Sequence, residues 1–246
     1  MKIIQLNIWG GKLGQQIIDF LGREKPDFVC MQEVNDLEGR AGYKFFATLD
    51  EIKEEASFKE AAMSASYSSR YMERELKYGN AVLSKFPLES AKTIFTRGEY
   101  KRDFDVTKDD GNLRNLQLVT IKVNGSVLNI LNHHGHHVPG TKAGNDETLR
   151  QMRIIADVID SLEGPVILCG DFNLAPDSKS ISILDGKLTN LSIKHGLKRT
   201  YNQFSVVNEV CDYIFVNDRV KVRHFGMSED LVSDHKALIL EFNLDL

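Results

Sequence analysis

The chain has 246 residues, of which 42% are hydrophobic and 27% charged, as is typical of globular proteins. Its formal net charge of −4 excludes the broad excess of basic residues expected for nucleic-acid or membrane-surface binding. A phosphate substrate is still compatible with this charge, because a bound divalent cation can supply positive charge locally.

Cysteine usage and the apolar runs also limit the cellular context. Cys30, Cys169 and Cys211 are widely spaced and lie in or beside apolar runs, so we expect reduced core thiols and a cytoplasmic location. The opening MKIIQLNIW has no signal-peptide pattern. No apolar run approaches the roughly 20 residues that span a bilayer, so no membrane insertion is expected.

Short apolar runs recur along the chain, with the length and the Val, Ile, Leu and Phe content of β-strands. In chain order they cover residues 2–8, 27–34, 80–86, 116–123, 126–133, 165–172, 212–217 and 236–244. The pair Asn124-Gly125 lies between two of these runs and predicts a tight hairpin turn.

Helical patterns alternate with these runs. Helices are predicted over residues 14–24, 145–163 and, in a shorter form, 176–188. Residues 50–77 are polar and only partly helical in pattern, so we expect a surface excursion or a mobile flap there. Hairpins mixed with crossover helices predict mixed rather than parallel sheets. Since no linker or internal repeat divides the chain, we expect a single domain over residues 1–246.

Polar side chains stand at the ends or starts of many predicted strands. They are Asn7, Glu33, Asn132, His134, Asp171, Asn173, Asp212, Asp234 and His235. Taken singly, most of them are ordinary turn, cap or strand-end residues. Together they can share one rim of a sheet, where several carboxylates would repel one another unless a cation lay between them. Oxygen ligands favour Mg²⁺ or Mn²⁺ in that place over zinc.

The order of the motifs LNIW, QEV, NHH, GDFN, CDYIF and SDHKAL resembles the endonuclease/exonuclease/phosphatase superfamily, which has the deoxyribonuclease I-like fold. The resemblance spans residues 5–242, and GDFN combined with QE upstream and SDH near the end is highly specific. It implies an α+β fold, a four-layer α/β/β/α sandwich of two mixed β-sheets. It also implies a divalent-metal-dependent phosphohydrolase that cleaves a phosphodiester or phosphomonoester bond.

The same resemblance implies roles around water and metal. Asp171 matches the group that activates or orients the attacking water, and Asn173 can hold that water or a phosphate oxygen. Glu33 matches the ligand of a Mg²⁺ or Mn²⁺ ion. Asn7 and Asp234 complete or support the ligand shell, partly through water, since Mg²⁺ usually keeps several waters.

A second set of matches concerns the phosphate. His235 matches a histidine that contacts the scissile phosphate, and Asp212 matches the acid that pairs with it. His134 is expected to bind phosphate or protonate the leaving group, although the neighbouring His133 fits the motif almost as well. Because adjacent strand residues face opposite ways, only one of the two should enter the site. Tyr78 matches a phosphate-binding tyrosine of some nucleases, or simply packs.

Four histidines in five positions, at 133, 134, 136 and 137, also raise the possibility of a zinc or nickel site. No cysteine or glutamate nearby completes such a set, so we favour one histidine in the phosphate site and the others on a solvated loop. Two further hypotheses therefore stand beside the phosphohydrolase. One is a zinc hydrolase built on the histidine cluster, and the other is a non-catalytic binding module that retains the fold.

The sequence says less about the substrate. Basic residues occur as scattered groups, at Lys101-Arg102, Lys198-Arg199 and around Lys221, and not as the continuous face that duplex DNA requires. A phosphoester substrate is expected, either a nucleic acid or a small phosphodiester. Nothing in the sequence indicates a protein partner.

Overall fold

The computed structural model describes residues 1–37, 45–123 and 125–245, so Asn124 of the predicted turn lies outside the described residues. Within those ranges, twelve strands form two six-stranded sheets. The first sheet has the order β11 (Val220–Met227), β12 (Leu238–Leu244), β1 (Lys2–Asn7), β2 (Phe28–Leu37), β4 (Arg74–Ser84) and β3 (Glu60–Tyr71). The second has the order β5 (Leu88–Arg97), β6 (Arg114–Val123), β7 (Ser126–His134), β8 (Val166–Asp171), β10 (Asp212–Val216) and β9 (Thr189–Asn190).

Both sheets are mixed, as predicted. In the first, β1 pairs in parallel with β2 and antiparallel with β12. In the second, β8 pairs in parallel with β7 and antiparallel with β10. The predicted hairpin is present, because β6 and β7 pair antiparallel up to Val123 opposite Ser126.

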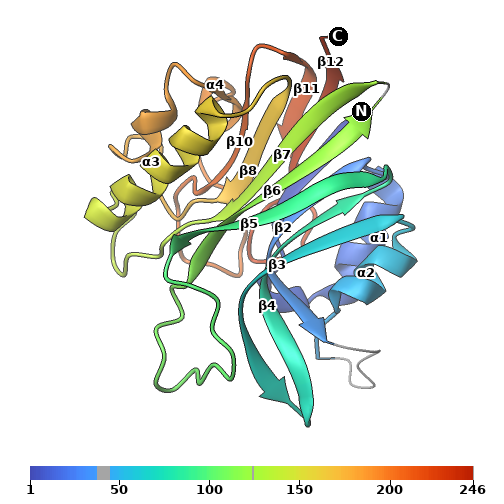
Figure 1. Cartoon of the computed structure of the whole chain (residues 1–246), viewed down its shortest axis with the longest axis vertical. Coiled ribbons are helices and arrows are strands. Elements are labelled where there is room, and N and C mark those ends of the chain that lie inside the picture. The colour runs from blue at the N-terminus through green and yellow to red at the C-terminus, as the bar shows by residue number, and fades with distance from the viewer. Residues whose placement is uncertain (38–44, 124, 246) are drawn as a thin grey trace.

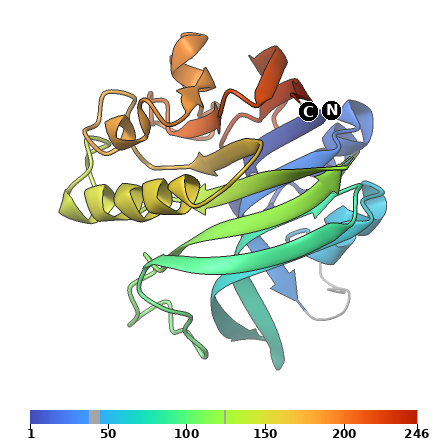
Figure 2. The same ribbon diagram turned by 45° about the horizontal axis from the view of Figure 1, so that its top comes forward.

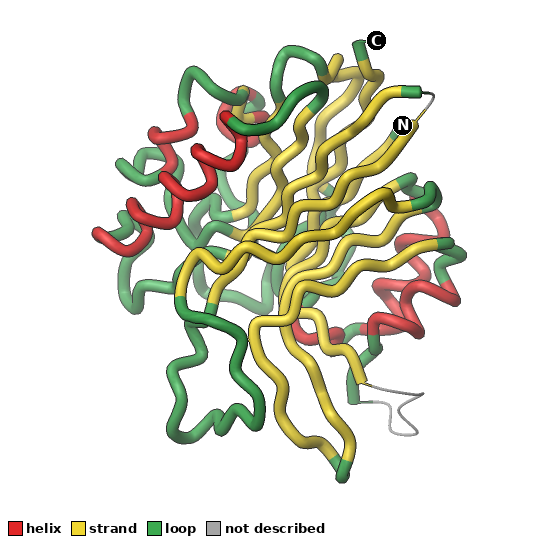
Figure 3. Tube along the Cα trace, viewed as in Figure 1, coloured by secondary structure: helices red, strands yellow, loops and turns green. Residues whose placement is uncertain are grey.

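Helices cover the outer face of each sheet and complete a four-layer α/β/β/α sandwich (Figures 1 and 3). The helices α1 (Gly14–Glu24) and α2 (Leu49–Glu55) bury Ile17, Phe20 and Ile52 against the first sheet. The helix α3 (Asp146–Asp160) buries Met152 and Ile155 against the second sheet. None of the helices among the described residues is long and apolar enough to span a membrane.

The two longer predicted helices are confirmed, as α1 and α3. The start of α3 is fixed by a capping box, in which Asn145 accepts from the backbone of Thr148 and the Thr148 hydroxyl accepts in return. The prediction of a helix over 176–188 is largely wrong, since only a short 3₁₀ helix η2 (Ile181–Leu184) forms there. A one-turn helix α4 (Leu191–Lys194) follows β9.

The prediction of a surface excursion or flap over residues 50–77 is wrong. After α2, this segment forms β3 and the beginning of β4, a long hairpin that projects from the sandwich (Figure 2). The inward side of β3 carries Ala62 and three serines, and Ser64 bonds to Asn115 of the second sheet. Small and polar inward residues obscured the alternation that Val or Ile would have made visible in the sequence.

Residues of both sheets share one apolar interior, which includes Ile3, Cys30, Ile130, Cys169 and Ile214. The chain termini lie at one end of it, where the Met1 amino group donates to the Phe242 carbonyl (Figure 2). At the opposite end, where β1 and β8 finish and β10 begins, the interior becomes polar. The predicted site residues gather at that end.

Candidate active site

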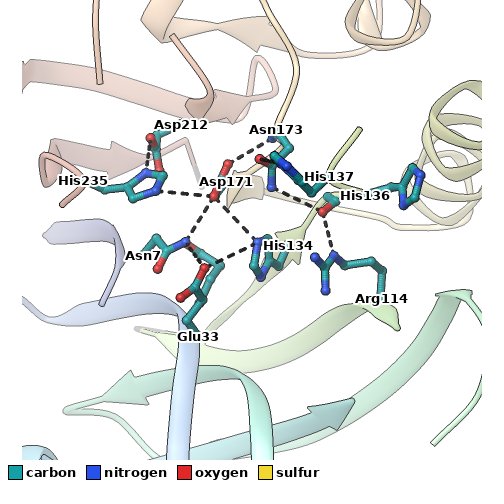
Figure 4. Close-up of polar contacts among 12 residues, drawn as sticks. Asn7, Glu33, Arg114, His134, His136, His137, Asp171, Asn173, Asp212 and His235 are labelled. Atoms are coloured by element: carbon teal, nitrogen blue, oxygen red, sulfur yellow. Dashed lines mark hydrogen bonds and ion pairs between the residues drawn. The ribbon is translucent and has the colours of Figure 1, made fainter. Parts of the chain in front are cut away.

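Asp171, the last residue of β8, lies at the centre of the polar cluster (Figure 4). Its Oδ2 accepts a hydrogen bond from Asn7 Nδ2 at 3.1 Å. The same oxygen lies 3.7 Å from both His134 Nε2 and His235 Nε2. Its Oδ1 accepts from the backbone N–H of Asn173 at 3.0 Å, so the two polar residues of GDFN are linked directly. Residues from positions 7 to 235 therefore meet around one carboxylate.

Glu33 reaches the cluster through an irregularity in β2. The register between β2 and β4 shifts between Met31 and Val34, and Glu33 has a φ of 57°. Such a bulge re-aims side chains, so that neighbouring residues need not point to opposite faces. Gln32 is buried between the sheets, whereas Glu33 accepts from Asn7 Nδ2 at 3.0 Å beside the cluster.

A buried amide network supports the cluster from beneath. Gln5 Nε2 donates to Gln32 Oε1 at 2.9 Å, and Gln32 Nε2 donates to Asn132 Oδ1 at 2.6 Å. Asn132 Nδ2 in turn donates to backbone carbonyls of β2 and β4. Because these side chains come from both sheets and are almost fully buried, they fix the relative position of the strands that carry the site.

The choice between the two strand histidines is decided by alternation along β7. His134 faces the cluster, while His133 is fully buried on the other face of the strand. There its Nδ1 lies 3.1 Å from the carbonyl of Asn115 and its ring packs edge-on against Phe172. The expectation that His133 lies on a solvated loop is therefore wrong.

The other two histidines separate as well. His137 Nδ1 lies 3.3 Å from Asn173 Oδ1, at the edge of the cluster. The ring of His136 points away from it (Figure 4), and its backbone N–H donates to Gln151. These four described imidazoles do not converge, so the geometry gives no support to a zinc centre built from them.

Asp212, the first residue of β10, holds His235 from behind. Its Oδ2 lies 2.9 Å from His235 Nδ1, and its Oδ1 accepts from Gln5 Nε2 at 3.0 Å. Burial alone would lower the pKa of His235, but the carboxylates of Asp212 and Asp171 outweigh burial and raise it to about 10. His235 is therefore an imidazolium at neutral pH, with Nε2 directed toward Asp171.

The acidic side of the cluster fits a cation. Burial raises the pKa of Glu33, and the nearby carboxylates of Asp171 and Asp234 raise it further. A divalent cation bound beside Glu33 would offset both effects, because it stabilises the charged carboxylate. Asp171, Asp212 and His235 also place potential ligand atoms within 4.8 Å of one another. Since a protonated imidazole has no lone pair to offer, we place the candidate site on the Glu33 side of Asp171.

The cluster opens into a cavity of about 400 Å³. Seven of the predicted site residues line it, namely Glu33, Tyr78, His134, Asp171, Asn173, Asp234 and His235. The remaining two, Asn7 and Asp212, are buried behind this lining and act on it through hydrogen bonds. All nine predicted site residues therefore lie in the lining of one cavity or directly behind it.

The model of the Endonuclease/Exonuclease/phosphatase family matches residues 4–235, which is most of the chain. The chain belongs to this family. Its members are phosphoesterases and nucleases, so the protein is placed among hydrolases. No curated protein sequence matches the chain significantly.

Solved structures of the family share the fold. A family protein from Beutenbergia cavernae aligns with a TM-score of 0.74 and 17% identity, over 99% of this chain and 71% of that one. The mannosyl-6-phosphatase Bt3783 of Bacteroides thetaiotaomicron gives 0.73 and 16%, over 99% and 100%. A humanized TDP2 of D. rerio gives 0.72 and 17%, over 99% and 98%. At these identities the likeness concerns the fold alone.

Tyr78 is the end of a stack of aromatic rings on one wall of the cavity. Its ring stacks on Tyr67 with centroids 4.9 Å apart, and Tyr67 stacks on Phe104 at 4.0 Å. Burial, aided by Glu33, raises the pKa of Tyr78 well above its usual range, so its hydroxyl keeps its proton and can donate to an oxygen. Packing and substrate contact are thus compatible for this residue.

Sequence reasoning missed several further residues of the lining, among them Arg114, Lys142 and Tyr201. Tyr201 packs on the His235 ring, with centroids 4.2 Å apart. Arg114 begins β6 and Lys142 lies in the loop between β7 and α3. None of them belongs to a motif quoted above, and only the meeting of their elements at the cavity reveals them.

Proposed function

We propose that this member of the family is a divalent-metal-dependent phosphohydrolase, which cleaves a phosphoester by in-line attack of an activated water. One observation carries the proposal. The Asp171 carboxylate faces a cavity between an imidazolium, His235, and an acidic group around Glu33. An orienting base, a cation for the phosphoryl oxygens and a set of metal ligands are the three parts that this reaction needs.

Asp171 would orient the attacking water and accept its proton. Burial opposes ionisation of Asp171, but the positive charges of His235 and Lys142 outweigh burial and lower its pKa. The carboxylate is therefore ionised at neutral pH. The backbone N–H of Asn173 and the Asn7 amide hold its two oxygens, so that its direction is fixed before the substrate arrives.

His235 would stabilise the charge on the phosphoryl oxygens. Its Nδ1–H is held by Asp212, which leaves the proton on Nε2 for the substrate. In a site shielded from water, such a preorganised donor stabilises the transition state more than it would in bulk solvent. Burial and the nearby Arg114 charge lower the pKa of His134 well below its usual range. His134 is therefore a neutral donor, suited to a phosphoryl or leaving-group oxygen.

Glu33 would hold the metal, with Asp234 and Asn7 in support. Asn7 Nδ2 donates hydrogen bonds to the carboxylates of both Glu33 and Asp171, and Asn7 Oδ1 accepts one from the backbone N–H of Trp9. Asn7 therefore orients the two carboxylates. The oxygen-rich set fits Mg²⁺ or Mn²⁺. When bound, the ion would neutralise charge on the phosphoryl group and bind an ester oxygen.

Hydrolysis of an aryl phosphate ester with and without Mg²⁺ or Mn²⁺ tests this function. We expect metal-dependent turnover that Asp171→Asn reduces by at least about a hundredfold while the fold is retained. The variant Lys179→Met, which alters an exposed residue outside the cavity, is the matched control. Full activity in Asp171→Asn would refute the role of Asp171. A wild-type protein inert toward phosphoesters in both metals would favour the non-catalytic binding module.

The proposed substrate is a phosphoester, with nucleic acids and small phosphate esters both in scope. The cytoplasm remains the proposed compartment, supported by the free and buried state of Cys30, Cys169 and Cys211.

A further inference from the structure

Lys142 brings a positive charge into the cavity from the loop between β7 and α3. Its half-buried side chain donates from Nζ to Asn173 Oδ1 at 2.7 Å and lies 5.9 Å from the ring centroid of Tyr201. Of the residues that the structure describes, none places a carboxylate in ion-pair contact with this ammonium. Two of its three N–H donors therefore remain available to a ligand.

Arg114 lines the same cavity, and among the described residues it too has no carboxylate in ion-pair contact. Its guanidinium donates to the carbonyls of Gly135, Gly111 and Leu113 and to the amide oxygen of Asn112. Arg114 is only 7% exposed, and the nearby carboxylates of Glu33 and Asp171 act on it without direct contact, so an anionic ligand in the cavity would meet a guanidinium that is not tied to a carboxylate.

These cations surround the position that the proposed reaction assigns to the phosphoryl group. His235 and Asn173 flank Asp171 (Figure 4). Lys142 donates to Asn173 and lies near the Tyr201 ring, which packs on His235. Arg114 lies beyond His134 (Figure 4). Its Nη2 donates to Asn112 Oδ1, which also accepts from the backbone N–H of His137. Three cationic groups thus line one cavity, in addition to the candidate metal site.

The number of charged oxygens on the substrate decides how many cations it can use. During in-line attack, the phosphoryl group presents three equatorial positions between the water and the leaving group. In a phosphomonoester all three are non-bridging oxygens, which share the charge of the dianion. In a diester one of them carries an organic substituent, which offers no charge and takes up space.

We propose that Lys142 makes this site selective for phosphomonoesters, by binding the third charged oxygen of a terminal phosphate. The inference rests on the proposed function and narrows its substrate class. Lys142 donates to Asn173, whose backbone N–H holds Asp171, so its ammonium lies in the cavity wall beside the group proposed to orient the water and can meet a phosphoryl oxygen. In a diester the same position would set the ammonium against an ester substituent.

A purely structural role for Lys142 makes a different prediction. Its hydrogen bond also orients the Asn173 amide, whose Nδ2 is directed toward the Gly135 carbonyl at 3.4 Å. If that were all, loss of Lys142 would weaken hydrolysis of monoesters and diesters by the same factor. Selectivity, measured as a ratio, separates the two roles.

The test compares 4-nitrophenyl phosphate with bis(4-nitrophenyl) phosphate, which share a leaving group. We expect the wild type to prefer the monoester, and Lys142→Met to lower the monoester-to-diester ratio of kcat/KM by about ten- to a hundredfold, the value of a charge-assisted hydrogen bond. Lys142→Arg should retain most of the preference. Lys179→Met should match the wild type.

Binding of inorganic phosphate, measured by calorimetry, provides a readout that needs no turnover. Lys142→Met should weaken it by a similar factor, and Lys142→Gln takes its place if the Met variant fails to fold. A wild type that prefers the diester, an unchanged ratio in the variant, or unchanged phosphate affinity would each overturn the proposal. If neither ester is hydrolysed in either metal, the proposed function fails, whereas the phosphate titration still decides whether Lys142 binds a terminal phosphate.

Discussion

His133 makes a sharp prediction about stability, because it is a fully buried histidine that the proposed chemistry does not use. Its Nδ1 lies 3.1 Å from the Asn115 carbonyl, which calls for a proton on Nδ1. Its Nε2 is buried and has no partner among the described residues. A second proton on Nε2 would therefore place an unpaired charge in the core, beside Phe172. The substitution His133→Gln keeps an amide donor near Asn115 and removes the titration.

The size of the pH effect on stability follows from the difference between the pKa of His133 in the folded and in the unfolded chain. Burial lowers the pKa of His133 from 6.5 to about 4. The unfolded chain takes up a proton near the higher value and the folded chain only near the lower one. The folded chain is therefore fully stable with respect to this group above the pKa of the unfolded chain. It loses stability as the pH falls toward the pKa of the folded chain. Between about pH 7.5 and about pH 5, this group alone removes about 2 kcal/mol from the free energy of unfolding.

Urea unfolding of the wild type and His133→Gln at both pH values measures this quantity. We expect the wild type to lose about 2 kcal/mol more than the variant over that interval, with similar m-values. Any constant effect of the substitution cancels in the difference. Hydrolysis near pH 7.5 should stay close to that of the wild type, since His133 does not line the cavity. Parallel losses of stability in the two proteins would refute the assignment of His133 as a buried neutral residue.

Three further predictions concern the site and its support. Glu33→Gln should raise the Mg²⁺ concentration needed for half-maximal activity, and an unchanged titration would remove Glu33 from the metal site. Asp212→Asn should reduce kcat less than His235→Ala does, because Asp212 only orients His235 and keeps it charged, whereas His235 itself would contact the phosphate. If steady-state kinetics showed the larger loss for Asp212→Asn, these two roles would be wrong. Gln32→Leu should lower the free energy of unfolding by about 1–3 kcal/mol, because it leaves the Asn132 amide oxygen without its donor. Denaturant titration checks this, and an unchanged midpoint would contradict the supporting role of the network.

The element pattern of the fold could be predicted where apolar periodicity was strong. The α1 and α3 helices and most strands of the interior follow directly from it. The hairpin of β3 and β4 could not be predicted in this way. Its inward positions are filled by alanine and serines, which match polar groups of the second sheet such as Asn115. A strand with small and polar inward residues can be recognised only when the sheet that it packs against is known.

The site, like the fold, has features that the sequence predicted and features that only the tertiary structure decided. The sequence by itself determined the motif order and, through its resemblance to a known family, the nine residues expected to form the site; most of them are polar groups near strand ends, which can share one rim of a mixed sheet. Only the tertiary structure decided which of His133 and His134 enters the cavity, since that depends on which face of β7 meets the other sheet. It alone also revealed Arg114 and Lys142. Their proposed role in binding phosphate depends on the distance between charges on different elements, which is set by packing and not by spacing along the chain.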